Sequence, residues 1–267
     1  MIWPLDPLQT LLERIYGVSS ELRVDDFLIS DPCSVRQLHR GGRESREKLL
    51  ISETGDELDV ALFVHQKILN TLAADDPVER LHDGNLDAFW IALEGVSHFL
   101  YLVCNACAGR SVRLLEMELQ AEVDKYILAA FLFGRQLRGL VPKALYRQLF
   151  HAARFDARLD AAERYRYRSA NYFASRFCSY IEKEFLQPGA RSGLVNSLRR
   201  FYRLTQQRIA HRPADNPRLT AGCFDGIKNL FQTSGLQHRV ICERSSRHAP
   251  YTRSCKSFSI PAVAPQM

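Results

Sequence analysis

Apolar residues recur at helical spacing through most of the segment from residue 86 to residue 210, whereas strand-like patterns are confined to the first 84 residues. Residues 47–52 and 57–64 alternate in part between polar and apolar positions, and Thr54-Gly55-Asp56 separates them. This pattern predicts a β-hairpin. Two short elements precede it, a helix over 7–16 and a strand-like segment around 27–29.

The segment from Leu86 to Cys107 is apolar on nearly every side, which is typical of a helix buried at the centre of a protein. A short connection leads into a second helical segment, 112–133, that should return antiparallel to the first. Further helical patterns follow over 142–155, over 160–185 and from 192 or 196 to 210. The predicted fold class is α+β, predominantly α-helical: a helical bundle built on this long antiparallel helix hairpin, with a small N-terminal strand and β-hairpin portion.

Three regions are predicted along the chain. Residues 1–84 form an N-terminal α+β portion with the β-hairpin, and residues 85–211 form the helical bundle. Residues 212–267 contain five prolines and keep an apolar period only near 224–231. Such a composition predicts a mostly disordered tail.

Cysteine usage and the N-terminal sequence favour a cytoplasmic location. The seven cysteines form an odd set without a recognisable spacing, and the first residues lack the basic and apolar regions of a secretory signal. The apolar segment 88–108 is the best candidate for a membrane span. It contains Glu94, His98 and Asn105, polar groups that are expensive in a bilayer, so we expect no membrane association.

The charge is distributed unevenly. Residues 1–134 contain 12 basic and 22 acidic side chains, whereas residues 135–212 contain 17 basic and 5 acidic ones, and 15 of those 17 are arginine. Two explanations are open: the two halves neutralise each other, or the basic half meets an anionic partner.

Five polar residues interrupt the apolar helix on a single face: Asp87, Glu94, His98, Tyr101 and Asn105. The returning helix presents Glu118, Glu122 and Lys125 together. Antiparallel pairing of the two helices sets three pairs side by side: Glu94 with Lys125, His98 with Glu122, and Tyr101 with Glu118. These pairs predict a structural polar seam that fixes the register of the two helices, with no cofactor.

The same residues support an alternative, a metal-dependent or acid–base site. Glu94, His98, Glu118 and Glu122 supply one imidazole and three carboxylates, the ligand types of di-iron carboxylate bundles. In the metal version of this alternative, Glu94, His98 and Glu122 hold Fe, Mn or Zn. The spacing departs from the di-iron pattern, because those bundles place Glu and His at i, i+3 and need a second such pair. The seam is therefore the favoured interpretation.

The basic block interleaves arginines with aromatic residues. Arg158, Arg164 and Arg168 lie on or next to one long predicted helix, and Arg199 and Arg203 lie on the next. Phe173, Phe177, Ile181 and Phe185 mark the core face of the long helix, which turns arginines outward. Arginines four residues apart can grip successive phosphates or carboxylates. We therefore predict that these five arginines bind an acidic protein or a nucleic acid.

Other motifs add little. Cys104 and Cys107 form a C-x-x-C at the C-terminal end of an apolar helix, where the helix dipole does not stabilise a thiolate, so both are predicted to be core residues. The chain contains no G-x-S-x-G, P-loop or G-x-G-x-x-G. The favoured function is a non-enzymatic binding or regulatory module, and the alternative is the metal-dependent or acid–base enzyme. Self-association is a third interpretation.

Overall fold

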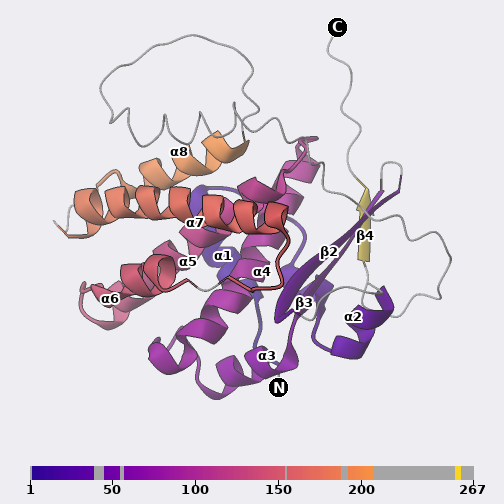
Figure 1. Cartoon of the computed structure of the whole chain (residues 1–267), viewed down its shortest axis with the longest axis horizontal. Coiled ribbons are helices and arrows are strands. Elements are labelled where there is room, and N and C mark those ends of the chain that lie inside the picture. The colour runs from indigo at the N-terminus through magenta and orange to yellow at the C-terminus, as the bar shows by residue number, and fades with distance from the viewer. Residues whose placement is uncertain are drawn as a thin grey trace, which may run out of the picture. The chain divides into compact units, whose positions relative to one another are not determined.

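The computed structural model describes residues 2–38, 45–54, 57–153, 155–187, 192–206 and 256–259. The predicted fold class, α+β and predominantly α-helical, is confirmed. The chain divides into two compact units, and Figure 1 labels their helices and strands. Of the described residues, those up to 112 and 256–259 belong to the first unit, and those from 113 to 206 belong to the second.

A small mixed sheet organises the first unit. Strands β2 (Glu47–Thr54) and β3 (Glu57–Val64) pair antiparallel over their whole length, so the predicted hairpin is confirmed. Because β2 occupies one edge of β3, the other edge is shared by two short strands. There β1 (Leu28–Ile29) pairs parallel with residues 62–63, and β4 (Lys256–Ser259) pairs antiparallel with residues 57–60.

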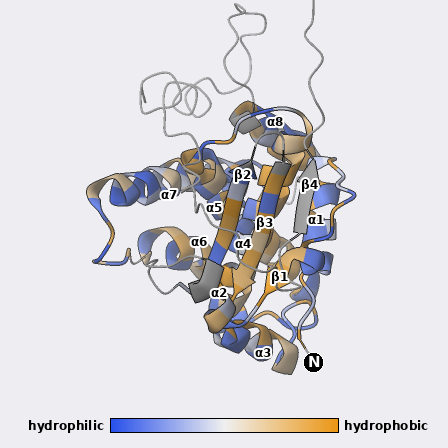
Figure 2. Cartoon of the chain, turned by 90° about the vertical axis from the view of Figure 1, so that its right-hand side faces the viewer, coloured by the Kyte–Doolittle hydropathy of each residue, from blue (hydrophilic) through white to orange (hydrophobic). Residues whose placement is uncertain are grey.

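The core of the first unit lies between this sheet and a long helix. Hydrophobic residues predominate along β3 (Figure 2), and Val60, Leu62 and Val64 are at most 1% exposed. Helix α4 (Asp83–Cys107) packs on β2, β3, α1 (Asp6–Tyr16) and α3 (Gln66–Ala74). This packing explains why α4 is apolar on nearly every side. The 3-10 turn η1 (Val24–Phe27) and helix α2 (Pro32–Leu38) complete the unit.

The second unit is helical. Helix α5 (Leu114–Gln136) packs mainly against α7 (Ala161–Ile181), and also contacts α6 (Ala144–Tyr146) and α8 (Leu194–Gln206). Two π-helical turns, η2 (Arg147–His151) and η3 (Glu182–Leu186), extend α6 and α7. Aromatic rings fill the core: the ring centroids of Phe177 and Phe201 lie 4.1 Å apart in a stacked pair.

Two predictions about the chain as a whole concern the tail and the membrane. Apart from β4, the predicted disordered tail at 212–267 lies outside the described residues. Among the residues that the structure describes, α4 alone is long and apolar enough to cross a membrane by length and composition. Its most apolar window is 83% buried inside the protein, as in the core helix of a soluble protein.

Candidate functional site

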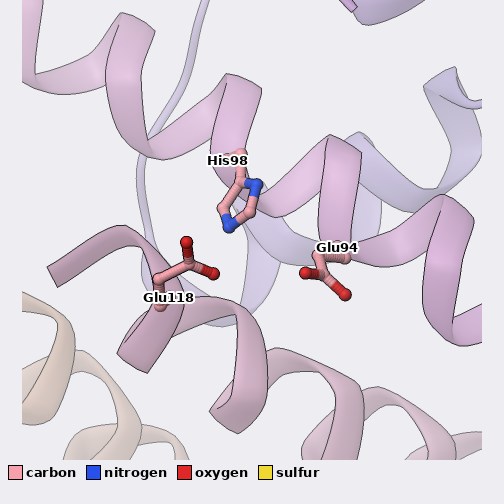
Figure 3. A group of neighbouring side chains, drawn as sticks. All are labelled: Glu94, His98 and Glu118. Atoms are coloured by element: carbon pink, nitrogen blue, oxygen red, sulfur yellow. The ribbon is translucent and has the colours of Figure 1, made fainter. Parts of the chain in front are cut away.

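Glu94 and His98 extend from the same side of α4, one helical turn apart (Figure 3). A carboxylate oxygen of Glu94 and a ring nitrogen of His98 lie within 4.8 Å of each other. His98 is buried and Glu94 is half-buried. The i, i+4 spacing read from the sequence thus brings a carboxylate and an imidazole together on one helix face.

A second carboxylate reaches His98 from the sheet. Oε1 of Glu47, the first residue of β2, lies 3.6 Å from Nδ1 of His98, and both side chains are about nine-tenths buried. Gly95 leaves the space for this approach, because a Cβ there would lie 3.0 Å from Cγ of Glu47 and 3.2 Å from its Oε1. Glu47 was not predicted as a site residue. The sequence offered one indication of its role, which is that a charged residue begins a predicted strand.

The candidate carboxylates on α5 have basic partners within the second unit. Oε1 of Glu118 lies 3.5 Å from Nε of Arg166 on α7, with both side chains mostly buried. Oε1 of Glu122 lies 2.5 Å from Nζ of Lys125, one turn further along α5. The pairing of Glu118 with Arg166 was not predicted, because α5 and α7 are separated by 24 residues of sequence, 137–160.

The five arginines predicted as binding residues differ in their surroundings. Arg158 is exposed and forms a two-oxygen ion pair with Asp156. Arg164 donates to the carbonyl oxygens of residues 157 and 159, and so holds the loop before α7. Arg168 is exposed on α7. On α8, Arg199 is half-buried, and exposed Arg203 donates to the carbonyl oxygen of Arg199.

Helix α7 is placed by a capping box and a buried face. The Asp160 carboxylate accepts from the backbone N–H of Glu163, whose own carboxylate accepts from the backbone N–H of Asp160. Ala170, Ala174, Phe177 and Ile181 are at most 1% exposed and pack into the unit. The opposite face of α7 is therefore turned outward.

That outward face carries the α7 stripe, which consists of Tyr165, Arg168, Tyr172 and Arg176. All four side chains are exposed, and the two tyrosines are each 53% exposed. Arg176 donates to the hydroxyl of Tyr172 over 3.3 Å and lies 5.9 Å from the centre of its ring. The i, i+3, i+7 and i+11 spacing puts aromatic and guanidinium groups in alternation along one side of the helix.

The C-x-x-C is not a core pair. Cys104 is half-buried but Cys107, the last residue of α4, is exposed, so the core prediction for Cys107 is wrong. Partial desolvation, with the nearby Glu21 carboxylate as a second cause, raises the pKa of the Cys107 thiol. A raised pKa disfavours the thiolate that redox chemistry requires.

Comparison with known proteins gives one partial similarity. The chain is 40% identical over 80 residues to a UPF0502 protein of Shewanella loihica, a match that covers 28% of this chain and 37% of that protein. No family model matches the chain, and no solved structure matches it. The chain thus spans little more than a third of the length of the relative that it resembles.

Proposed function

We propose that this protein is a binding module whose α7 stripe docks on an acidic segment of a partner protein. The observation that supports the proposal is the exposure of Tyr165, Arg168, Tyr172 and Arg176 on the face of α7 opposite its buried residues. A helix holds the backbone of these residues at fixed spacing, so the backbone needs no further ordering on binding.

The chemistry of the stripe suits carboxylates on a protein surface. Guanidinium groups bind carboxylates through paired N–H donors, and tyrosine and arginine are the residue types enriched in the energetic centres of protein interfaces. Lysine, which interfaces disfavour, is absent from α7, whereas the helix has four arginines. The contact between Arg176 and Tyr172 pre-orients one guanidinium for this role.

Charge around the stripe favours an anionic partner. Within α7, Glu163 is the single acidic residue beside the four arginines, and α8 adds three arginines and no acidic residue. A surface of one sign accelerates the encounter with an oppositely charged partner, and salt weakens that attraction. A cytoplasmic location and self-association stay predictions alongside this proposal.

Fluorescence anisotropy with two labelled probes, an oligoglutamate peptide and an oligo-dT strand, tests the proposal on the full chain. We expect the peptide to bind, and the double variant Arg168→Glu/Arg176→Glu to weaken that binding by at least about tenfold. The matched control is Lys143→Glu/Arg147→Glu, which makes the same change in charge at two exposed positions, the N-cap of α6 and the first residue of η2, and should leave binding unchanged.

Three outcomes contradict the proposal. Failure of the wild-type chain to bind the peptide does so directly. Equal losses of affinity in the stripe variant and the control variant would show that binding depends on net charge and not on the α7 stripe. Binding of oligo-dT alone, with the steep salt dependence of phosphate contacts, would identify a nucleic-acid-binding face instead.

A further inference from the structure

We propose that Glu94 and His98 bind a divalent first-row transition-metal ion on α4, with Glu47 as a positioning residue. This site lies in the first unit and does not depend on the function proposed for α7. One imidazole and one carboxylate are ligand types that Mn²⁺, Fe²⁺ and Zn²⁺ share, and water completes the coordination of such ions.

The spacing of the two ligands suits chelation. Atoms bound to one metal ion at bond lengths of about 2.1 Å lie roughly 3.0–3.5 Å apart. The oxygen of Glu94 and the ring nitrogen of His98 lie within 4.8 Å, on the same side of one rigid helix. Binding requires the half-buried Glu94 side chain to turn toward the imidazole.

Glu47 gives His98 the surroundings of a metal ligand. A metal-bound histidine commonly donates its other ring N–H to a carboxylate, which fixes the tautomer and makes the ligating nitrogen more basic. Oε1 of Glu47 faces Nδ1 of His98 at 3.6 Å, an ion-pair contact slightly longer than a hydrogen bond, and the charge of this carboxylate favours a proton on Nδ1. A proton held on Nδ1 directs the lone pair to Nε2, so Nε2 is the atom that we assign to the metal.

The local charge also favours a cation. Two carboxylates, Glu47 and Glu94, lie around one imidazole, and His98 and Glu47 are both about nine-tenths buried. Attraction between these carboxylates and a dication is strong where water is largely excluded. The neighbouring carboxylate of Asp87 is different, because it is exposed and paired with Arg46 at 2.6 Å.

Mn²⁺ is the probe that tests the site. The chain contains seven cysteines, which favour Zn²⁺ as thiolates, whereas Mn²⁺ prefers oxygen and nitrogen ligands. Full-length protein, first dialysed against a chelator, is titrated with MnCl₂, and the loss of the electron paramagnetic resonance signal of free Mn²⁺ measures binding. We expect one bound ion per chain in the wild type.

Four variants distinguish ligands, positioning residue and control. His98→Ala should abolish binding, and Glu94→Gln should weaken it by at least about tenfold. Glu47→Gln should keep one site with the resonance spectrum of bound Mn²⁺ unchanged, but with an affinity about 10–100-fold lower, the usual cost of losing a carboxylate behind a ligating histidine. Asp87→Asn removes a paired carboxylate from the same helix and should bind as the wild type does.

The proposal is overturned if the wild-type chain binds no Mn²⁺, or if binding survives both Glu94→Gln and His98→Ala. Circular dichroism checks that each variant folds. If His98→Ala does not fold, the near-isosteric Glu94→Gln decides, and unchanged binding in that variant also overturns the proposal. Assignment of Glu47 is wrong if Glu47→Gln changes the spectrum of bound Mn²⁺, or if it leaves the affinity unchanged.

Discussion

The guanidinium of Arg166 on α7 faces the carboxylate of Glu118 on α5, with Nε and Oε1 3.5 Å apart and both side chains mostly buried. This ion pair joins the two helices that make the main packing contact of the second unit. Burying two charges is costly, and their mutual attraction repays that cost only while both are present. The pair is therefore expected to add little net stability, whereas the loss of one of its two charges should be costly.

Loss of Arg166 should destabilise the second unit because it leaves the Glu118 carboxylate buried without its partner. We expect Arg166→Met to lower the free energy of unfolding by about 3 kcal/mol, as for other broken buried ion pairs. Arg168→Met is the control on the same helix. Arg168 is exposed, so its loss should cost less than about 0.5 kcal/mol. Urea denaturation followed by circular dichroism measures the free energy of unfolding of both variants. Equal losses in Arg166→Met and Arg168→Met would show that the ion pair with Glu118 has no special role.

Tyr126 should make the protein sensitive to alkaline pH. Burial, with the Glu182 carboxylate as the second cause, raises the pKa of Tyr126 far above its ordinary value of 10.0. The folded state then holds the phenolic proton more tightly than the unfolded state. This stabilisation is complete below pH 10 and is lost as the pH rises above it, because the unfolded chain ionises first.

The Tyr126→Phe variant tests this expectation. The variant loses the hydrogen bond to Glu182 and should be about 1 kcal/mol less stable than the wild type at pH 8. The difference should narrow above pH 10, since the variant has no phenol to ionise at this position. Tyr165→Phe, at an exposed position, should follow the wild type throughout. If the difference in stability between Tyr126→Phe and the wild type stays constant from pH 8 to pH 11, Tyr126 is not the group that causes the sensitivity to alkaline pH.

The close contact of α4 with the sheet should make Gly95 intolerant of a branched side chain. A Cβ at this position would lie 2.8 Å from Cδ1 of Leu62, which is fully buried on β3. We expect Gly95→Val to lower the free energy of unfolding by about 2 kcal/mol through overpacking. Gly95→Ala should cost less, because alanine adds only the Cβ and gains about 1 kcal/mol in helix propensity. Thermal melts measure both variants, and a lower melting temperature for Gly95→Ala than for Gly95→Val would contradict this expectation.

The sequence predicts elements far better than it predicts partners. Helical spacing of apolar residues identified α4, α5 and α7, and alternation of apolar and polar residues identified the β2–β3 hairpin. The outward direction of α7 also followed from Phe177 and Ile181, which are buried. These features depend only on residues within one element.

Partners contributed by distant elements were not predictable from the sequence. Glu47 meets His98 across fifty-one positions of sequence, and Arg166 meets Glu118 across forty-eight. Local spacing does not determine which strand or helix approaches a polar group, since that depends on how whole elements pack. Arg164 differs from Arg168 for a local reason, because the loop directly before α7 offers it two carbonyl oxygens, although both arginines fit one i, i+4 pattern.

The start of α1 depends on such a distant partner. The N-cap residue, Leu5, has no polar side chain that could cap the helix. The carboxylate of Asp25 takes this role by accepting hydrogen bonds from the backbone N–H groups of Leu5 (2.7 Å) and Asp6 (3.2 Å). Asp25→Ala removes both acceptors and should cost about 1 kcal/mol, the usual loss for a helix cap. Asp25→Asn should recover only part of that loss, because its amide offers one acceptor oxygen and turns an N–H donor toward the other backbone N–H. Asp26→Ala, at the exposed neighbouring position, is the control. The denaturation midpoint of each variant measures these losses. If Asp25→Asn has the same midpoint as the wild type, a single acceptor oxygen is enough.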